Sequence, residues 1–281
     1  MIRSYFGLKQ NPFASDNIAL LPHQQTIFDT LRVHCQQGGL CLVLGEPGTG
    51  KTAIKESFKS FDTKRLVTPM VSRTLHTYYS TIRILCQAFS LDFEGRTFAC
   101  EKRLIEEAFK LNQMGKMLAP IIDDAHLMDI QCLRKLRLLF EDFPKNHNLI
   151  LIGQPSLLNT VSLSANQDIK SRITYSAIMP KLAPDDMEAF ILAQFDRVGL
   201  GHNTLTPEAL ALIVRSAEGI LRRARNLCLS CLLEAVRDQT KTVDLKHVNH
   251  VLLQPHWRKH DDPLWSIAIP DRSQFDRSAA K

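Results

Sequence analysis

The octapeptide GEPGTGKT, at positions 45–52, constrains the fold of this chain more than any other stretch. It satisfies the spacing G-x-x-x-x-G-K-[ST], follows the apolar run LCLVLG (40–45), and opens TAIKESFKSF (52–61), which has helical periodicity. In this setting Gly48 and Gly50 allow backbone N–H groups to close around phosphate oxygens, and the helix N-terminus favours their negative charge. We therefore expect a phosphate-binding loop, here called the P-loop, between a buried strand and a helix.

The P-loop also supplies the side chains that a bound nucleotide needs. Lys51 is expected to reach the β- and γ-phosphates, and the Thr52 hydroxyl is expected to bind Mg²⁺. The expected cofactors are therefore ATP and Mg²⁺. The expected nucleotide-binding residues of the loop are Gly45, Glu46, Pro47, Gly48, Thr49, Gly50, Lys51 and Thr52.

A second acidic element follows another apolar run, in MLAPIIDDAH (117–126). Asp123 is expected to hold the Mg²⁺ shell, directly or through water, and Asp124 to orient or deprotonate the attacking water. Two adjacent acids could instead cap the next helix. Two carboxylates directly after a buried strand favour the catalytic interpretation.

Short apolar runs alternate with longer amphipathic segments from about Gly39 onward. This rhythm predicts an α/β fold with a mainly parallel, five-stranded sheet covered on both faces. The expected strands are 40–45, 65–71, 117–123, 148–153 and 173–179, and the expected helices between them are 52–61, 78–89, 99–114 and 130–143.

The pattern changes after Pro180 to helices alone. We therefore expect an α/β domain at 1–180 and a small all-helical lid at 181–253, with helices at 185–198, 206–216, 221–237 and 244–253. Residues 254–281 lose periodicity and carry both tryptophans, which predicts a tail that docks on a partner or a neighbouring subunit, or packs on its own domain.

Composition excludes several classes of protein. A hydrophobic fraction of 44% with 23% charged residues is that of a globular chain, so disorder and collagen-like repeats are excluded. The seven cysteines lie among apolar neighbours, which favours reduced thiols. The N-terminus does not read as a signal peptide, and no stretch reaches the roughly 18 apolar residues of a membrane span. We expect a cytoplasmic protein without a membrane partner.

The P-loop, the DDAH box at 123–126 and the helical module behind them together resemble the AAA+ ATPases. The resemblance is to the ExeA-like branch, which includes the ATPases that accompany transposases in the style of MuB, TnsC and TniB. It covers residues 5 to about 253. The fold it implies is a P-loop AAA+ module followed by a helical lid, and it implies assembly into a ring or helical homo-oligomer.

Further site residues are carried over from this resemblance. YFGLKQNPF (5–13) is similar to the opening motif of the branch, which implies that Asn11, Pro12 and Phe13 close over the nucleotide base. LIGQP (151–155) resembles sensor 1 and implies that Gln154 lies beside the γ-phosphate. SRITYSAIMPKL (171–182) implies that Arg172 is an arginine finger that reaches the ATP of a neighbouring subunit.

GILRRARNLC (219–228) resembles sensor 2 and points to Arg222. Leu221 replaces the proline of the family pattern, so Arg223 and Arg225 stay open as alternatives. The family usually has Glu at the position of Asp124, and the shorter side chain retracts the carboxylate by about an ångström, which predicts slow hydrolysis. Without the resemblance, Arg172 and Arg222 would read as ordinary solvated arginines.

The net charge of +6 favours anionic partners. An oligomer repeats each basic contact, so a few Lys or Arg per subunit can bind double-stranded DNA without reading its sequence. The expected contacts are Arg73 and Thr74, after the second strand, and Lys102 and Arg103. Ordinary solvated helix faces explain most of the basic residues in this sequence.

The expected function is that of an ATP-dependent DNA-binding regulator of transposition. It would oligomerise on duplex DNA with ATP and recruit or activate a transposase, with a target-selection protein where one is present. The secretion branch of the family typically adds a membrane span and a periplasmic module, neither of which this sequence shows. The alternatives are a cytosolic ExeA-like ATPase for secretion-complex assembly and a nucleotide-switched scaffold with negligible hydrolysis.

A zinc site is a weaker interpretation of one further spacing. Cys228 and Cys231 precede His247 and His250 at nearly the separation of a zinc finger. Both cysteines lie within the apolar run LCLSCLLEAV, where thiols serve as small core residues. Core packing is therefore the expected role of the two cysteines.

Overall fold

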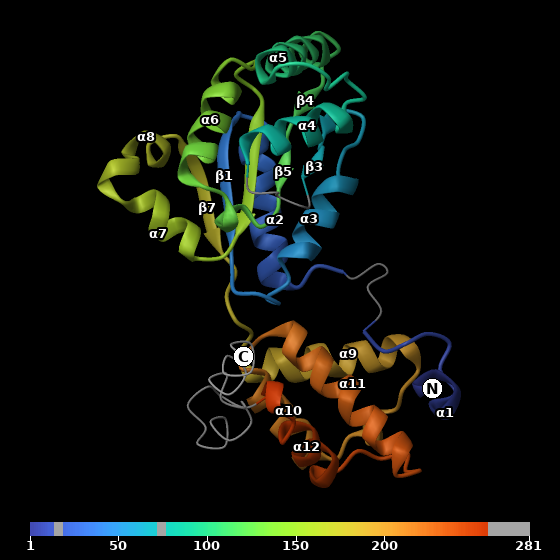
Figure 1. Ribbon diagram of the computed structural model, residues 1–281. Coiled ribbons are helices and arrows are strands. Elements are labelled where there is room, and N and C mark those ends of the chain that lie inside the picture. The colour runs from blue at the N-terminus through green and yellow to red at the C-terminus, as the bar shows by residue number, and fades with distance from the viewer. Residues whose placement is uncertain (14–18, 72–76, 258–281) are drawn as a thin grey trace, which may run out of the picture. The chain divides into compact units, whose positions relative to one another are not determined.

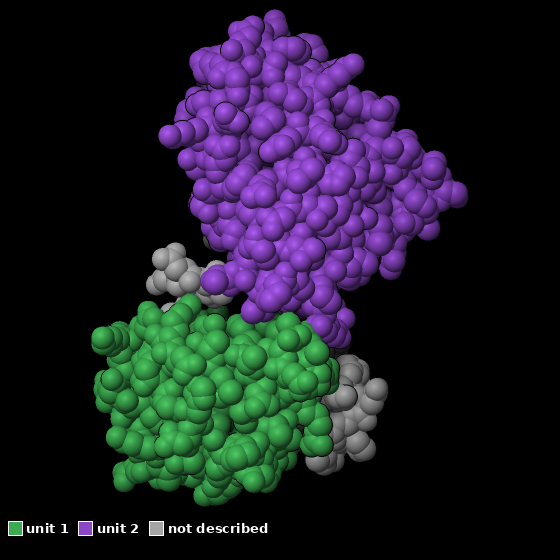
Figure 2. Space-filling view, turned by 180° about the vertical axis from the view of Figure 1, so that it is seen from behind, with its two compact units in different colours: residues 1–15, 182–281 green, residues 16–181 purple. Residues whose placement is uncertain are grey.

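The computed structural model describes residues 1–13, 19–71 and 77–257, and the chain divides into two compact units (Figures 1 and 2). The first, here called the α/β unit, is Asp16–Lys181. The second, the helical unit, combines Met1–Ser15 with Leu182–Lys281. The N-terminal residues thus belong with the helical unit and not with the α/β domain in which the sequence analysis placed them.

The α/β unit is built around a parallel sheet with strand order β3-β5-β6-β1-β7, which confirms the predicted five-stranded sheet (Figure 1). A two-stranded parallel ladder, β2-β4, lies outside it. The strands are β1 (Gly39–Leu44), β2 (Leu66–Val67), β3 (Met70–Val71), β4 (Met117–Leu118), β5 (Ile121–Ile122), β6 (Asn148–Gly153) and β7 (Ile173–Ile178). The helices are α2 (Pro22–Cys35), α3 (Lys51–Ser60), α4 (Tyr78–Ala88), α5 (Thr97–Gln113), α6 (Ile130–Glu141), α7 (Ser156–Ser162) and α8 (Gln167–Lys170), with 3₁₀ turns at Ala125–Leu127 and Ser164–Asn166.

Two of the predicted strands are interrupted at a proline. The run 65–71 breaks between β2 and β3, where Pro69 lies, and the run 117–123 breaks between β4 and β5 at Pro120. Proline has no N–H to donate to a ladder, so regular pairing lapses there. Hydrogen bonds nevertheless continue along both runs, from Ala119 N–H to the Val67 carbonyl (2.9 Å) and from Ile121 N–H to the Pro69 carbonyl (2.9 Å).

Alternate residues of the central strands face opposite layers of helices. On β1, Leu40, Leu42 and Leu44 pack in one core with α4, α5 and α6. Cys41 and Val43 face the other core, which α2 and α3 cover. This burial on both faces is what a parallel sheet requires, and it explains why β1 is apolar without interruption.

The helical unit has its own apolar core. Its helices begin at strong start signals: Thr206 Oγ1 accepts the Ala209 N–H at 3.2 Å, and proline occupies the first turn of both α9 and α10. Phe13, only 3% exposed, packs between Phe190 and Phe195 of α9, which ties the N-terminal segment to this unit. The elements are α1 (Ile2–Phe6), α9 (Pro184–Val198), α10 (Pro207–Ala217), α11 (Leu221–Arg237) and α12 (Leu245–Leu252), with 3₁₀ turns at His202–Thr204 and Pro255–Trp257.

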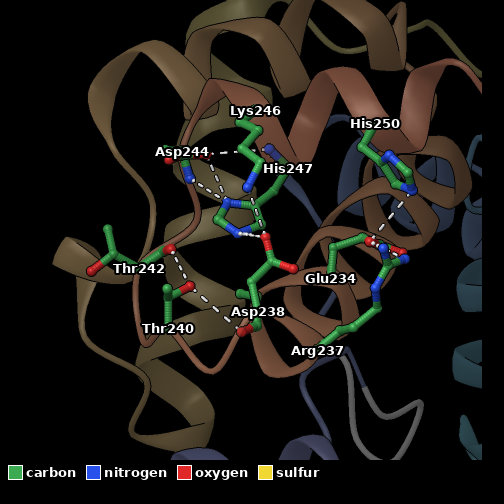
Figure 3. A network of polar contacts seen from close by, with 10 residues as sticks. Glu234, Arg237, Asp238, Thr240, Thr242, Asp244, Lys246, His247 and His250 are labelled. Atoms are coloured by element: carbon green, nitrogen blue, oxygen red, sulfur yellow. Dashed lines mark hydrogen bonds and ion pairs between the residues drawn. The ribbon is translucent and has the colours of Figure 1, made fainter.

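A polar network joins α11 to α12 (Figure 3). His247 Nδ1 lies 2.7 Å from Asp244 Oδ1, and its Nε2 lies 3.6 Å from Asp238 Oδ2. Lys246 Nζ also contacts Asp238, at 3.1 Å, and His250 lies 3.6 Å from Glu234. Both histidines therefore face carboxylates.

The two cysteines of the zinc-like spacing lie in the apolar core of the helical unit. Cys228 and Cys231 are fully buried. Burial raises the pKa of Cys231 to about 12 and raises that of Cys228 well above its usual value. Because metal binding needs a thiolate, the structure favours core packing for both residues.

Within the described ranges, no helix combines the length and apolarity needed to cross a membrane.

Candidate functional site

The P-loop connects β1 to α3 in the geometry that its sequence predicts. Gly48 has φ 90° and Gly50 has φ 99°, a region of backbone conformation that favours glycine. Gly50 is also the N-cap of α3, and no side chain caps the N–H groups of that first turn. The first N–H groups of an α-helix have no acceptor four residues back within the helix, so this turn offers a cradle of donors suited to an anion, although the Ala53 N–H already donates to the Gly50 carbonyl at 2.9 Å.

The shape of the P-loop is fixed by a hydrogen bond within the loop and by contacts with the segment that follows β7. Thr49, which is 2% exposed, donates from Oγ1 to the Glu46 carbonyl at 2.9 Å. A Cβ on Gly45 would lie 2.8 Å from the Met179 Cβ, so the chain just after β7 presses directly on the loop. Lys181, two residues further on, pairs with Glu46 at 3.0 Å. The loop is therefore pre-shaped by its surroundings.

Lys51 and Thr52 open α3 beside this cradle. Lys51 Nζ donates to the carbonyl oxygens of Gly45 (2.7 Å) and Glu46 (2.9 Å), and the Thr52 residue is exposed. An ammonium group and a hydroxyl at the mouth of an N–H cradle fit the phosphates and the Mg²⁺ of a nucleotide.

The acidic pair follows β5, next to β6 in the sheet. Asp123 accepts the Asp124 N–H on Oδ1 at 3.0 Å and a hydrogen bond from Lys55 Nζ on Oδ2 at 2.7 Å. Asp124 is exposed, with its Oδ1 4.0 Å from His126 Nδ1. Asp124 is the N-cap of the 3₁₀ turn Ala125–Leu127, yet its side chain makes no cap hydrogen bond. Capping therefore does not explain the exposed carboxylate.

Three strand ends bring the predicted chemistry together. β5, β6 and β1 are neighbours in a parallel sheet, and they are followed at the same edge by Asp123, Gln154 and the P-loop. A Cβ on Gly153 would lie 3.1 Å from the His126 backbone nitrogen, so the end of β6 packs against the DDAH box. Ligands of open α/β sheets bind at this carboxyl edge.

Arg172 lies at the other edge of the sheet. It immediately precedes β7, whose first residue, Ile173, pairs with Leu40 at the start of β1, whereas the P-loop follows the end of β1. Its Nε lies 3.2 Å from Glu141 Oε1, an oxygen that also accepts from Arg137 Nη1 at 2.8 Å. The structure therefore does not bring Arg172 to the P-loop of its own subunit.

The sensor-2 candidates lie at the start of α11, in the helical unit. Arg222 and Arg225 are exposed, whereas Arg223 pairs with Glu218 at 2.9 Å. Of the three arginines, Arg222 and Arg225 thus have the more accessible side chains.

The N-terminal motif differs from its expected role in one respect. Asn11 is exposed, but Pro12 and Phe13 are buried, and the Phe13 ring contacts Phe190 and Phe195. Phe13 is only 3% exposed, so of the three residues Asn11 is the one with an accessible side chain.

Two of the candidates for DNA contact, Lys102 and Arg103, lie in the described part of the chain, and each forms an ion pair with an acidic side chain. Lys102 lies 3.8 Å from Glu106, and Arg103 lies 3.1 Å from Asp92. Lys102 also borders a cavity of about 890 Å³ between α4, α5 and α6 that is largely apolar. This setting leaves less charge for a phosphate backbone than the sequence suggested. Arg73 and Thr74 lie outside the described residues.

Two residues of the site carry no motif signal. Lys55 contacts Asp123, and Lys181 contacts Glu46. In the sequence Lys55 is one of several lysines, and its burial on α3 beside Ile54 is a finding of the structure. Its contact with a residue far along the chain becomes visible only in the folded structure.

Comparison with known proteins agrees with this geometry. Residues 33–161 match the family model described as AAA domain. The *Aeropyrum pernix* ORC2 protein, solved as ADPNP-ADP complexes, superposes with a TM-score of 0.68 at 14% identity, over 89% of this chain and 74% of that one. *Drosophila* ORC bound to DNA gives a TM-score of 0.65 at 17% identity, over 97% and 69%. This is the AAA+ fold.

The chain is also similar in sequence to a known protein. The chain is 27% identical over 249 residues to General secretion pathway protein A of *Aeromonas hydrophila*, which covers 84% of this chain and 45% of that protein. The chain thus spans less than half of this relative's length. Similarity to an ExeA-type AAA+ ATPase is confirmed, whereas the transposition-associated branch stays a prediction.

Proposed function

We propose that this chain binds ATP with Mg²⁺ at the P-loop edge of the sheet and hydrolyses it. The observation that carries the proposal is the convergence of the P-loop, Asp123, Asp124 and Gln154 at the ends of three neighbouring strands. The AAA+ fold supports it, since this is the edge at which α/β sheets bind ligands.

Each residue of the site has a task in that reaction. The N–H groups of the P-loop and the Lys51 ammonium hold the phosphates, while Thr52 and Asp123 hold the metal, directly or through water. Mg²⁺, when bound, offsets negative charge on the β- and γ-phosphates. Asp124 accepts a proton from the attacking water, and the Gln154 amide orients that water beside the γ-phosphate.

Two substitutions separate binding from hydrolysis. Lys51→Ala removes the phosphate-binding charge, so binding of a fluorescent ATP analogue should be lost. Asp124→Asn keeps the cradle but removes the base, so the analogue should bind while phosphate release falls by about 10²-fold or more. Lys59→Ala, an exposed residue on the same helix, is the matched control. Full ATPase activity in Asp124→Asn would contradict the role of that residue.

We further propose that ATP drives assembly of this chain on double-stranded DNA, and that the assembly regulates transposition by recruiting a transposase. The resemblance at YFGLKQNPF and LIGQP is to the ExeA-like branch, which includes ATPases that accompany transposases. The exposed position of Arg172 at the edge away from its own P-loop fits a residue that acts on a neighbouring subunit. The fold likeness to *Drosophila* ORC, whose structure is titled as bound to DNA, is compatible with this chemistry.

Electron microscopy with ATP and duplex DNA tests this assembly. We expect rings or helical filaments with the wild-type chain, and Arg172→Ala should assemble but lose the ATPase stimulation that assembly brings. Monomers alone under these conditions would contradict the proposal. Undiminished stimulation in Arg172→Ala would remove the trans-acting role of this arginine.

A second candidate is an ATPase that serves secretion-complex assembly. The 27% identity to General secretion pathway protein A over 84% of this chain favours it. The two candidates differ in their response to DNA. ATPase activity and self-assembly that are wholly indifferent to duplex DNA would favour the secretion role, whereas stimulation by DNA would favour the first candidate.

A further inference from the structure

A lysine lies against the carboxylate that is expected to serve the metal. Lys55 Nζ is 2.7 Å from Asp123 Oδ2, and the two side chains are only 10% and 20% exposed. The other oxygen of Asp123, Oδ1, accepts the Asp124 N–H at 3.0 Å. Both oxygens of Asp123 are thus engaged by the protein itself.

The position of Lys55 on α3 is set by the helix core. Ile54 and Phe58 on the same helix are fully buried and hold α3 against the sheet. Lys55 follows Thr52 by three residues, a spacing that places two side chains on the same side of a helix. The metal-binding hydroxyl and the Lys55 ammonium therefore belong to the same side of α3.

Separating the Lys55 ammonium from Asp123 would be energetically unfavourable. The Lys55 side chain is 90% buried, and an unpaired charge at such a position is strongly unfavourable. The pair also ties α3 to the end of β5, which is a structural role. The ion pair nevertheless places a permanent positive charge beside the expected metal position.

We propose that Lys55 is a built-in cation of the nucleotide site and makes ATP binding by this chain depend only weakly on Mg²⁺. This inference rests on the proposed function, since it assigns Lys55 a positioning role toward ATP and its metal. The fixed charge attracts the polyphosphate without metal, and it opposes the approach of a divalent cation to Asp123. Both effects reduce the difference in affinity between ATP and its magnesium complex.

The size of the effect follows from the charges. One unit charge a few ångströms from a divalent cation changes binding by about tenfold or more even where the effective dielectric constant is as high as that of water. Removing the charge should weaken metal-free binding and strengthen the binding of Mg²⁺. The ratio of the two dissociation constants, without and with Mg²⁺, should therefore rise by about tenfold.

Equilibrium binding of a fluorescent ATP analogue, in EDTA and across a Mg²⁺ titration, tests this inference without measuring turnover. Wild type should lose no more than about tenfold in affinity when Mg²⁺ is removed. Lys55→Gln keeps a hydrogen-bond donor for Asp123 but removes the charge, so the ratio should rise and half-saturation should need less Mg²⁺. Lys55→Arg should keep the wild-type ratio. Lys59→Gln, on the exposed side of the same helix, is the control and should also keep it.

Each outcome decides a different point. A wild-type chain that binds the analogue with Mg²⁺ but loses clearly more than about tenfold in EDTA overturns the inference, even where Lys55→Gln fails to fold. A folded Lys55→Gln protein with an unchanged ratio overturns it as well and leaves the proposed ATP site intact. No binding by wild type in either condition overturns the proposed function and this inference together.

Discussion

At the scale of single residues, Asp124 has an unusual backbone. Its φ is 52°, in the left-handed region that Asp and Asn tolerate better than most residues. The sequence analysis gave Asp124 a role toward the attacking water and noted that it is shorter than Glu, but it gave no reason for an Asp at this position. The structure adds a local reason for Asp at this position, because its short polar side chain suits the turn that begins the 3₁₀ segment Ala125–Leu127.

We therefore expect Asp124→Glu to hydrolyse ATP faster than wild type and to be less stable. The longer side chain extends the carboxylate by about an ångström, so we expect hydrolysis to rise by about 10- to 100-fold. The left-handed backbone should cost the variant about 1 kcal/mol in its free energy of unfolding. Phosphate release and thermal melting on the same sample measure both effects. A Glu variant that hydrolyses ATP more slowly than wild type would contradict the explanation by reach.

Candidate site residues could be recognised in the sequence only where the motif is local. The P-loop and the DDAH box are contiguous, and their spacing alone indicated Lys51, Thr52, Asp123 and Asp124. Lys55 was missed, because its significance depends on a contact with Asp123 that only the fold creates.

At the scale of elements, periodicity predicted the sheet and the helices of the helical unit closely. The segment 221–237 coincides with α11 as the structure has it. Pro69 and Pro120 each interrupt a predicted strand. Proline has no N–H to donate to a ladder, and a strand prediction based on hydrophobic runs does not take this into account. Helix α2 was not predicted, although Ile27, Phe28, Leu31 and Cys35 recur at helical spacing, because the sequence analysis followed the strand–helix pattern only from about Gly39 onward.

The polar network between α11 and α12 should make the stability of the helical unit sensitive to acid. The hydrogen bond from Lys246 lowers the pKa of Asp238, with a smaller contribution from His247. A carboxyl whose folded pKa lies below its unfolded value of about 4 stabilises the fold at neutral pH. That stabilisation is lost as the pH falls through the folded pKa.

Lys246→Met should remove part of this acid sensitivity. Without the ammonium, the pKa of Asp238 returns toward its ordinary value, so the folded and unfolded chains take up this proton at nearly the same pH. The drop in melting temperature between pH 7 and about pH 3 should therefore be smaller than in wild type. Circular dichroism measures it, with exposed Lys241→Met as the control. An equal drop in Lys246→Met and wild type would contradict this.

At the scale of the whole molecule, the chain crosses between its two units twice. The α/β unit is Asp16–Lys181, and the helical unit takes residues from both sides of it. The sequence YFGLKQNPF does not indicate whether Phe13 packs in the core of the α/β unit or in that of the helical unit. The sequence analysis assigned these residues to the α/β domain. Burial of Leu8 and Phe13 decides their place.

Phe13→Ala should destabilise the helical unit. Removing a buried phenylalanine ring leaves a cavity beside Phe190 and Phe195, at a cost of about 3–5 kcal/mol in the free energy of unfolding. Denaturant unfolding followed by circular dichroism measures the loss. Phe98→Ala, a phenylalanine that is 75% exposed, should leave stability almost unchanged. Equal stability of Phe13→Ala and wild type would contradict the placement of this residue.

The double crossing makes the α/β unit an inserted domain, with consequences for the order of events during synthesis. Residues 1–13 are translated before Asp16–Lys181, whereas their packing partners on α9 are translated after it. Closing so long a loop carries an entropic cost that a collapsed insert reduces, because its two ends are then held at fixed positions. Residues 1–13 are therefore expected to reach their native contacts with α9 only after the inserted α/β unit has been made.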